Sequence, residues 1–238
     1  MPDSDLFFDI QGSLVPSVSL DSAHTALLVV DMQYHDAHPD GAFNVAMEKL
    51  QPGSMTYFNQ RTEGTTVPAI KKLLAAAREY GIRVIYLTLG SLYSDYRDMD
   101  ARQRQWITTL EDRSGIAKIF CSDNPDHRIR EELAPLPGEI IVPKTTFGAF
   151  NGSNLQAVLT EHNIASLIVV GVSTNCCVEG TIRDAAERGY GCVVISEATA
   201  DYDEYAHEAS LRALAFNHCR VVEKVDTVIS AIAGGEQL

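Results

Sequence analysis

The sequence predicts an α/β protein with a mostly parallel β-sheet and helices on both faces of the sheet. Short apolar runs rich in β-branched residues, such as Leu167–Val170, alternate along the chain with segments of helical periodicity. This alternation is typical of parallel sheets, because a crossover helix returns the chain to the start of the next strand. No repeat, low-complexity tract or linker divides the 238 residues. We therefore expect a single domain over residues 1–238.

Strands are expected wherever an apolar run of four to eight residues is bounded by turn-forming residues, because such a run is too short for a buried helix. Five runs meet this description, at residues 25–31, 82–89, 139–142, 167–170 and 191–196, and a shorter sixth strand is expected at 220–222. The run at 167–170 is apolar on both faces, as in a strand that is buried on both sides.

Helices are expected where apolar residues recur three and four positions apart. The segments with this pattern are 67–80, 153–162, the stretch after residue 175, 204–218 and 225–233, with a short helix near 127–133. Gly81 follows the first of them as a stop signal. Three other segments lack a clear period. We expect an N-terminal arm at 1–24, an irregular connection at 32–64, and a lid or subunit-contact segment at 90–115.

The composition excludes several classes of partner. The formal net charge is −13 and the sequence pI is about 4.9, which disfavours nucleic acid and anionic membrane surfaces. No apolar run is long enough to span a bilayer, and the N-terminus carries acidic residues where an export signal needs basic ones. Five scattered cysteines without a C-x-x-C pair suit free thiols, so a cytoplasmic location is expected.

Three chemically reactive side chains stand at the ends of expected strands. They are Asp31, Lys144 and Cys177. In open α/β sheets, ligands bind beyond the carboxyl ends of the strands, so the fold can bring a base, a cation and a nucleophile to one edge. Each residue also has a structural interpretation: a turn cap for Asp31, a solvated lysine for Lys144, and a small core residue for Cys177.

Two adjacent cysteines, Cys176 and Cys177, fall in the first turn of the helix that follows residue 175. A helix N-terminus favours the thiolate form of cysteine, and its free N–H groups can hold an oxyanion. The helix dipole alone does not distinguish the two thiols.

Three segments carry a family resemblance. Val29–Gln33, Pro143–Phe150 and Gly171–Ala185 together resemble the isochorismatase-like cysteine hydrolases, over residues 25 to 230. The resemblance implies a three-layer fold with a six-stranded, mostly parallel sheet. It also implies assembly into a homodimer or homotetramer.

The resemblance assigns roles to the three reactive residues. Cys177 would be the nucleophile, Asp31 the base that takes its proton, and Lys144 the cation between them. A cis peptide bond would join Val172 and Ser173, and the N–H groups of Ser173 and Cys177 would form the oxyanion hole. Cys176 would fill a variable position.

The family resemblance also guides the choice of reaction. The Asp-x-His metal site of nicotinamidase-like members has no counterpart after the second strand, so neither a metal nor a cofactor is expected. The sequence His35–His38 is interpreted as a solvated loop. Because Cys177 is present, we expect cleavage of a C–N bond in a small linear amide, ureido or carbamoyl compound through a thioester. The alternatives are an isochorismate-type vinyl ether hydrolase and a binding subunit without catalysis.

Substrate-binding residues are the least constrained part of the prediction. The candidates are Gln33, Tyr34, Phe147, Phe150 and Asn175, with Asn175 also a candidate helix cap. Tyr202 and His207 are further candidates to reach the pocket, and a structural role is favoured for His207. No arginine stands out as a clamp for a substrate carboxylate.

Overall fold

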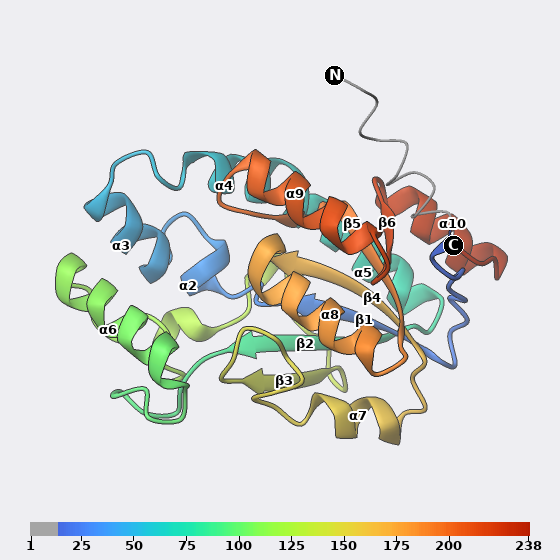
Figure 1. Cartoon of the computed structure of the whole chain (residues 1–238), viewed down its shortest axis with the longest axis horizontal. Helices are drawn as coiled ribbons and strands as arrows, with labels where there is room; N and C mark the ends of the chain where they lie inside the picture. Colours follow the sequence, from blue (N-terminus) through green and yellow to red (C-terminus); the bar gives the residue numbers. More distant parts are fainter. Residues whose placement is uncertain (1–13) are drawn as a thin grey trace.

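The computed structural model describes residues 14–238 and has a six-stranded sheet with every neighbouring pair parallel (Figure 1). The strand order is β3-β2-β1-β4-β5-β6. The strands are β1 (Thr25–Val30), β2 (Arg83–Leu89), β3 (Ile140–Lys144), β4 (Ser166–Val172), β5 (Gly191–Ala200) and β6 (Arg220–Val222). The predicted α/β fold is therefore confirmed, and the sheet is wholly rather than mostly parallel.

Helices cover both faces of this sheet. The α-helices are α2 (Tyr34–Ala37), α3 (Ala42–Leu50), α4 (Thr56–Arg61), α5 (Val67–Glu79), α6 (Ala101–Ser114), α7 (Leu155–Glu161), α8 (Glu179–Glu187), α9 (Glu204–Ala215) and α10 (Val225–Gly234). Shorter turns are η1 (Thr62–Thr66), η2 (Pro125–His127), η3 (Glu131–Leu133) and η4 (Thr174–Val178). The chain steps one way from β1 to β2 and the opposite way from β4 to β5. Right-handed crossovers therefore place α5 and α8 on opposite faces (Figure 1).

This reversal of direction creates a switch point between β1 and β4, the place where open α/β sheets bind ligands. Both strands are buried along their whole length. Gly171 lets them approach closely, because a Cβ at this position would lie 2.1 Å from the Val30 carbonyl oxygen. Its φ of +117° is also one that residues with a side chain rarely adopt. The residue that follows Val30 is Asp31, so the glycine sets the spacing at the first candidate catalytic residue.

Replacing Gly171 by alanine is expected to lower the free energy of unfolding by at least about 2 kcal/mol, because a clash adds to the backbone strain. Gly138→Ala is the matched control. Gly138 also has a positive φ, of +93°, but no atom lies within 4 Å of the position that an added Cβ would take. Urea unfolding of both variants measures the difference. Equal losses of stability would contradict the importance of the β1–β4 approach.

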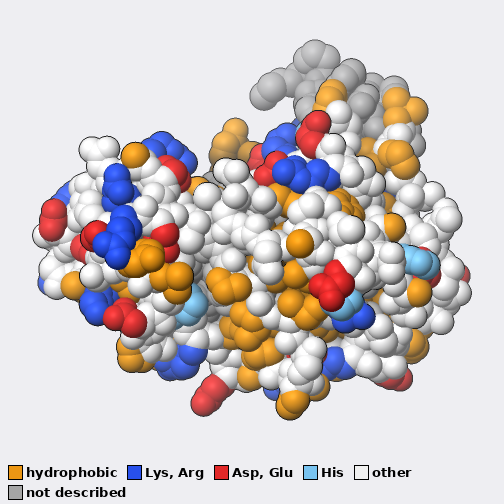
Figure 2. All heavy atoms as spheres, turned by 90° about the horizontal axis from the view of Figure 1, so that it is seen from below, with side chains coloured by type: hydrophobic (Ala, Val, Ile, Leu, Met, Phe, Trp, Pro, Cys, Tyr) orange, Lys and Arg blue, Asp and Glu red, His pale blue; other side chains and the backbone are white. Residues whose placement is uncertain are grey.

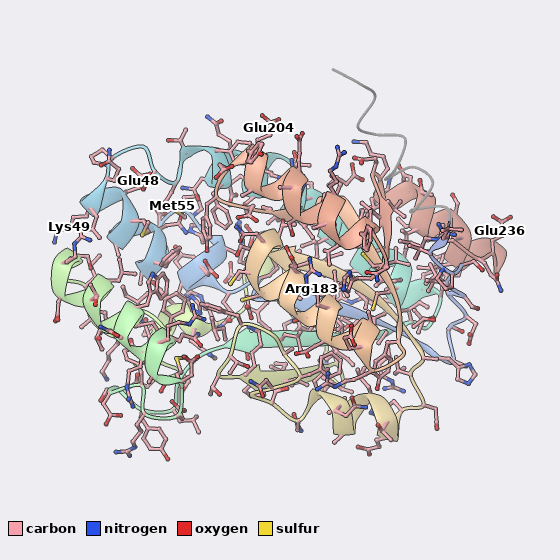
Figure 3. All side chains as sticks on the ribbon, viewed as in Figure 1. Glu48, Lys49, Met55, Arg183, Glu204 and Glu236 are labelled. Atoms are coloured by element: carbon pink, nitrogen blue, oxygen red, sulfur yellow. The ribbon has the colours of Figure 1, made fainter. Side chains whose placement is uncertain are left out.

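The segment 32–64, expected to be irregular, is instead largely helical. It contains α2, α3, α4 and the start of η1. Each helix is too short to show a clear apolar period in the sequence, and prolines and glycines interrupt the pattern between them. Figure 3 shows Glu48 and Met55 where α3 leads toward α4. The Glu48 carboxylate accepts hydrogen bonds from the N–H groups of Gly53 and Met55, at 2.7 Å each, and fixes this connection.

The segment 90–115 contains α6, which packs against α3 beyond the carboxyl ends of the strands (Figure 1). Its N-terminus is capped by Asp100, whose side chain accepts from the N–H groups of Arg102 and Gln103. Ile107 and Leu110 are buried beneath it. The helix therefore covers the strand ends, where the sequence predicted a lid or subunit contact.

The described part of the N-terminal arm, residues 14–24, lies on the body of its own chain. Val18 exchanges two backbone hydrogen bonds with Leu238, at 2.7 and 3.0 Å, and Val15 and Leu20 are buried. Residues 1–13 of the predicted arm lie outside the described residues. Within residues 14–238, no helix combines the length and apolar character needed to cross a membrane.

The edge strand β3 borders a surface with exposed apolar side chains. Ile141 of β3 and the nearby Leu136 are about half exposed, at 48% and 50%. Figure 2 views the molecule from below, the side of β3 and α7 in Figure 1, and shows hydrophobic side chains gathered there. Such surfaces commonly serve as contacts between protein chains. Formation of a homo-oligomer stays a prediction.

Candidate active site

Asp31, Lys144 and Cys177 meet at the switch point of the sheet. Asp31 follows β1, Lys144 is the last residue of β3, and Cys177 lies in η4 after β4. Lys144 Nζ lies 2.7 Å from Asp31 Oδ2, and both side chains are completely buried. Lys144 also donates to the carbonyls of Thr146 and Phe147, at 3.1 Å each. The solvated position that the sequence allowed for Lys144 is therefore wrong, because the lysine is a buried partner of Asp31.

The charges of the three groups depend on one another. Burial raises the pKa of the Asp31 carboxyl, while the Lys144 ammonium and hydrogen bonding with Cys177 oppose the rise. Burial disfavours the Lys144 ammonium, but the charge of Asp31 raises its pKa above the ordinary value. The lysine therefore stays charged, and the carboxylate beside it is a stronger base than an exposed aspartate.

The Cys177 thiol is not predisposed to ionise. Hydrogen bonding with Cys176, burial and the negative charge of Asp31 raise its pKa well above the ordinary value, against the effect of Lys144. The expectation of a thiol that favours the thiolate at rest is therefore not met, because these three causes together raise the pKa of Cys177. A base must remove the thiol proton, and Asp31 is in contact with it.

The turn that carries Cys177 has an unusual backbone. The peptide bond between Val172 and Ser173 is cis, as the family resemblance implies. The Ser173 carbonyl accepts hydrogen bonds from the N–H groups of Cys176 and Val178, at 3.2 Å each. The N–H group of Cys177, between them, does not bond to this carbonyl. Asp201 holds the same turn by accepting from the Asn175 N–H at 2.6 Å. This arrangement suits an oxyanion hole formed by Ser173 and Cys177, whose role stays a prediction.

Gln33 fixes the backbone beside Asp31. Its amide oxygen accepts from the Leu89 N–H at 2.7 Å, and its nitrogen donates to the carbonyls of Leu89 and His127, at 3.3 and 2.9 Å. The side chain is completely buried. Gln33 thus ties the ends of β1 and β2 to η2, and its hydrogen bonds go to the main chain.

The side chains of two other predicted substrate-binding residues, Tyr34 and Phe150, have partners other than Asp31, Lys144 and Cys177. Tyr34 is stacked between His38 and the guanidinium of Arg128, with distances of 4.1 Å between the rings and 4.0 Å to the cation. Phe147 contributes its carbonyl to Lys144. Phe150 packs near Tyr190, 6.0 Å between ring centroids.

Asn175 has an exposed side chain, and the helix start at Ser173 has no side-chain cap. His207 is buried and bonded through Nδ1 to the hydroxyl of Thr174 at 2.9 Å, which agrees with the structural role favoured for it.

His35 and Asp36, in the segment interpreted as a solvated loop, are instead buried beside the triad. Their relative exposures are 0% and 5%. The interpretation was wrong because α2 turns the segment inward, where α3 and η2 pack against it. Burial lowers the pKa of His35 to about 3, so its ring is neutral. Burial and the charge of Asp31 raise the pKa of Asp36 to about 7.

Aromatic rings surround this polar group. The Phe120 ring lies 4.9 Å from His35 and 5.6 Å from Phe43, and Tyr202 lies 5.9 Å from Phe43 and 5.1 Å from Phe58. Tyr202, a candidate from the sequence, interacts with Cys177 and Asp36 and forms a hydrogen bond with Ser173. Among residues 14–238, no group of three or more His, Cys, Asp or Glu side chains is arranged to hold a metal ion.

The fold and the sequence place this chain in a family of hydrolases. The isochorismatase domain matches residues 25–227, and the chain belongs to the isochorismatase family of hydrolases. The cysteine hydrolase structure from Pseudomonas syringae pv. phaseolicola 1448A superposes with a TM-score of 0.76 and 29% identity, over 93% of this chain and 99% of that one.

Sequence comparison identifies relatives with named activities. The ureidoacrylate amidohydrolase of Agrobacterium fabrum is 32% identical over 76% of this chain and 78% of its own length. The ureidoacrylate amidohydrolase of Stutzerimonas stutzeri is 30% identical over 82% and 77%. N-carbamoylsarcosine amidase from Thermoplasma acidophilum shares the fold, with a TM-score of 0.62 and 22% identity over 85% of this chain and 97% of that one.

Proposed function

We propose that this chain is an amidohydrolase that cleaves a C–N bond of a small linear amide, ureido or carbamoyl compound, with Cys177 as nucleophile. The observation that carries the proposal is the buried contact of Asp31 with both Lys144 and Cys177 at the switch point of the sheet. The names of the ureidoacrylate amidohydrolase relatives support the same reaction class.

In the first half of the reaction, Asp31 takes the thiol proton as Cys177 Sγ attacks the carbonyl carbon of the substrate. Lys144 remains an ammonium throughout and keeps the carboxylate ionised until it receives this proton. The N–H groups of Ser173 and Cys177 stabilise the oxyanion of the tetrahedral intermediate. The C–N bond then breaks, ammonia or an amine leaves with the proton from Asp31, and a thioester remains on Cys177.

In the second half, Asp31 takes a proton from water, which attacks the thioester carbonyl. A second tetrahedral intermediate collapses, the C–S bond breaks, and the thiolate recovers the proton from Asp31. The product is a carboxylic acid, or a carbamic acid that loses carbon dioxide. The complete burial of Asp31 and Lys144 favours small substrates and keeps bulk water from the charged groups.

The experiment that tests the proposal measures ammonia release from a panel of small amides, ureido acids and hydrazides. We expect wild-type protein to hydrolyse at least one class, and Cys177→Ala to lose activity by a factor of about 10³ or more. Cys192→Ala is the matched control, because Cys192 is a buried thiol in β5 outside the triad. A thioester adduct on Cys177 should appear by mass spectrometry after rapid acid quenching.

Two outcomes would contradict the mechanism. Full turnover by Cys177→Ser on a vinyl ether substrate would indicate the isochorismate-type reaction. Absence of hydrolysis across the panel, together with a Cys177 no more reactive than Cys192 toward a small electrophile, would indicate a binding protein of the same fold.

A further inference from the structure

The polar group formed by His35 and Asp36 has no function in the mechanism above. Neither ring nitrogen of His35 has a hydrogen-bond partner of good geometry among residues 14–238, although the Leu89 main chain lies near the ring, and Asp36 Oδ1 also has none. Both side chains are more than nine-tenths buried. Buried polar atoms are almost always paired in folded proteins, so unpaired ones beside a reactive centre indicate a ligand position.

These atoms lie close enough to the reacting groups to sense their charges. The Asp36 carboxyl interacts with the charges of Asp31 and Lys144 and forms a hydrogen bond with Tyr202. Tyr202 in turn interacts with Cys177. The His35 ring is affected by the charge of Lys144. His35 and Asp36 therefore belong to the same buried region as the nucleophile.

The surroundings of this region are apolar, which increases the difference in binding energy between charged and uncharged substrate groups. The Phe120 ring lies 4.9 Å from His35, and the rings of Phe43, Tyr202 and Phe58 continue an aromatic cluster from it. Little water enters such an environment, so charges there are only weakly screened. A charged group on the substrate would therefore interact strongly with any fixed charge nearby.

The positive charges on the neighbouring segments have other partners. Arg130, in the turn before η3, pairs with Glu63 and Glu132 and donates to the Ala37 carbonyl. Arg61 of α4 donates to the carbonyls of Ser196 and Thr199.

Lys144 is paired with Asp31. A carboxylate on the substrate would therefore approach two aspartates, Asp31 and Asp36, and a neutral imidazole. Of the cations just described, Lys144 and Arg130 already have carboxylate partners, and the Arg61 guanidinium is held by main-chain carbonyls of β5.

Building on the proposed function, we propose that His35 and Asp36 form the specificity subsite of the enzyme and receive a hydrogen-bond-donating, uncharged or cationic end of the substrate. Asp36 accepts an N–H or O–H group, and His35 accepts or donates a second hydrogen bond. Above pH 7, where the Asp36 carboxyl has lost its proton, substrates with a carboxylate at this end are disfavoured by like-charge repulsion. The preferred substrates are thus carbamoyl or amide compounds whose far end is an amide, amine or hydroxyl group.

The test uses carbamoyl compounds of equal length that end in a carboxamide, a primary amine or a carboxylate. At pH 8, where Asp36 is ionised, we expect the wild-type kcat/KM, from ammonia release, to favour the first two over the carboxylate by at least about tenfold. Asp36→Asn should reduce this ratio toward one, chiefly by raising kcat/KM for the carboxylate. Asp40→Asn is the control, because it removes the same charge from an exposed position four residues away.

A separate binding measurement keeps this inference distinct from the proposed chemistry. Calorimetric titration of Cys177→Ala with the same compounds should show the same order of affinity whether or not the wild type turns them over. Preference for the carboxylate, or an equal effect of Asp36→Asn on all three compounds, would overturn the inference. Hydrolysis failing while the binding order holds would overturn only the proposed function.

Discussion

Lys144→Met is expected to lower the free energy of unfolding by about 3–5 kcal/mol, because it leaves the Asp31 carboxylate buried without its cation. Asp31→Asn should cost a similar amount by leaving the ammonium unpaired. The double variant Asp31→Asn/Lys144→Met should be more stable than the sum of the single losses predicts, because neither charge remains. Each variant should also lose hydrolysis by a factor of about 10²–10⁴, as expected for removing an acid–base group or its partner.

Urea unfolding of the wild type, both single variants and the double variant measures the coupling. The surface pair Lys118–Asp123 provides the control, since its side chains are at least half exposed and their nitrogen and oxygen lie 2.6 Å apart. Lys118→Met should change stability by less than about 1 kcal/mol. Strictly additive losses at positions 31 and 144 would mean that the buried pair is not the stabilising contact inferred from its geometry.

Asp36→Asn is expected to stabilise the protein increasingly as the pH rises from 4 to 8. The pKa of Asp36 is about 7 in the folded protein, against an ordinary value of 3.8. Between these values the folded state holds a proton that the unfolded state has lost, so folding stability falls as the pH increases. Above pH 7 the loss reaches its full size, about 4 kcal/mol at most. Asparagine does not ionise, so the variant does not lose this stability as the pH rises.

The measurement compares the unfolding free energies of Asp36→Asn and wild type at several pH values. The difference should be near zero at pH 4 and largest at pH 8, and the Asp40→Asn control should show no such trend. A difference that does not change with pH would contradict the buried, protonated state of Asp36. This stability test does not depend on finding a substrate.

The sequence predicted that the reactive residues lie at one edge of the sheet, because Asp31 and Lys144 directly follow or end apolar strands and Cys177 lies in the turn after another. A charged side chain such as Asp31 or Lys144 at the end of a buried run has few structural explanations, and the parallel sheet brings such ends together. The pairing of Asp31 with Lys144 therefore follows from topology. The strand lengths were less well predicted, since β5 extends to Ala200 through a segment that contains polar residues.

The surroundings of the triad were harder to predict because they depend on tertiary packing. His35 and Asp36 stand in a polar, proline-containing segment that looks solvated, and only the packing of α3 and η2 against α2 buries them. The protonation of Cys177 was also not predicted, because it depends on the contact with Cys176, on burial and on the charge of Asp31. Local sequence gives no sign of either contact.

The hydrogen bonds of Gln33 have a consequence for how this family can diversify. One amide side chain holds the main chain on both sides of the pocket, independently of the side chains at positions 35 and 36. We therefore expect those two residues to be exchangeable without displacing the Asp31 carboxylate. The proposed reaction centre is thus held separately from the side chains of α2, so we expect substitutions in that one helical turn to change the preferred compound more than the chemistry.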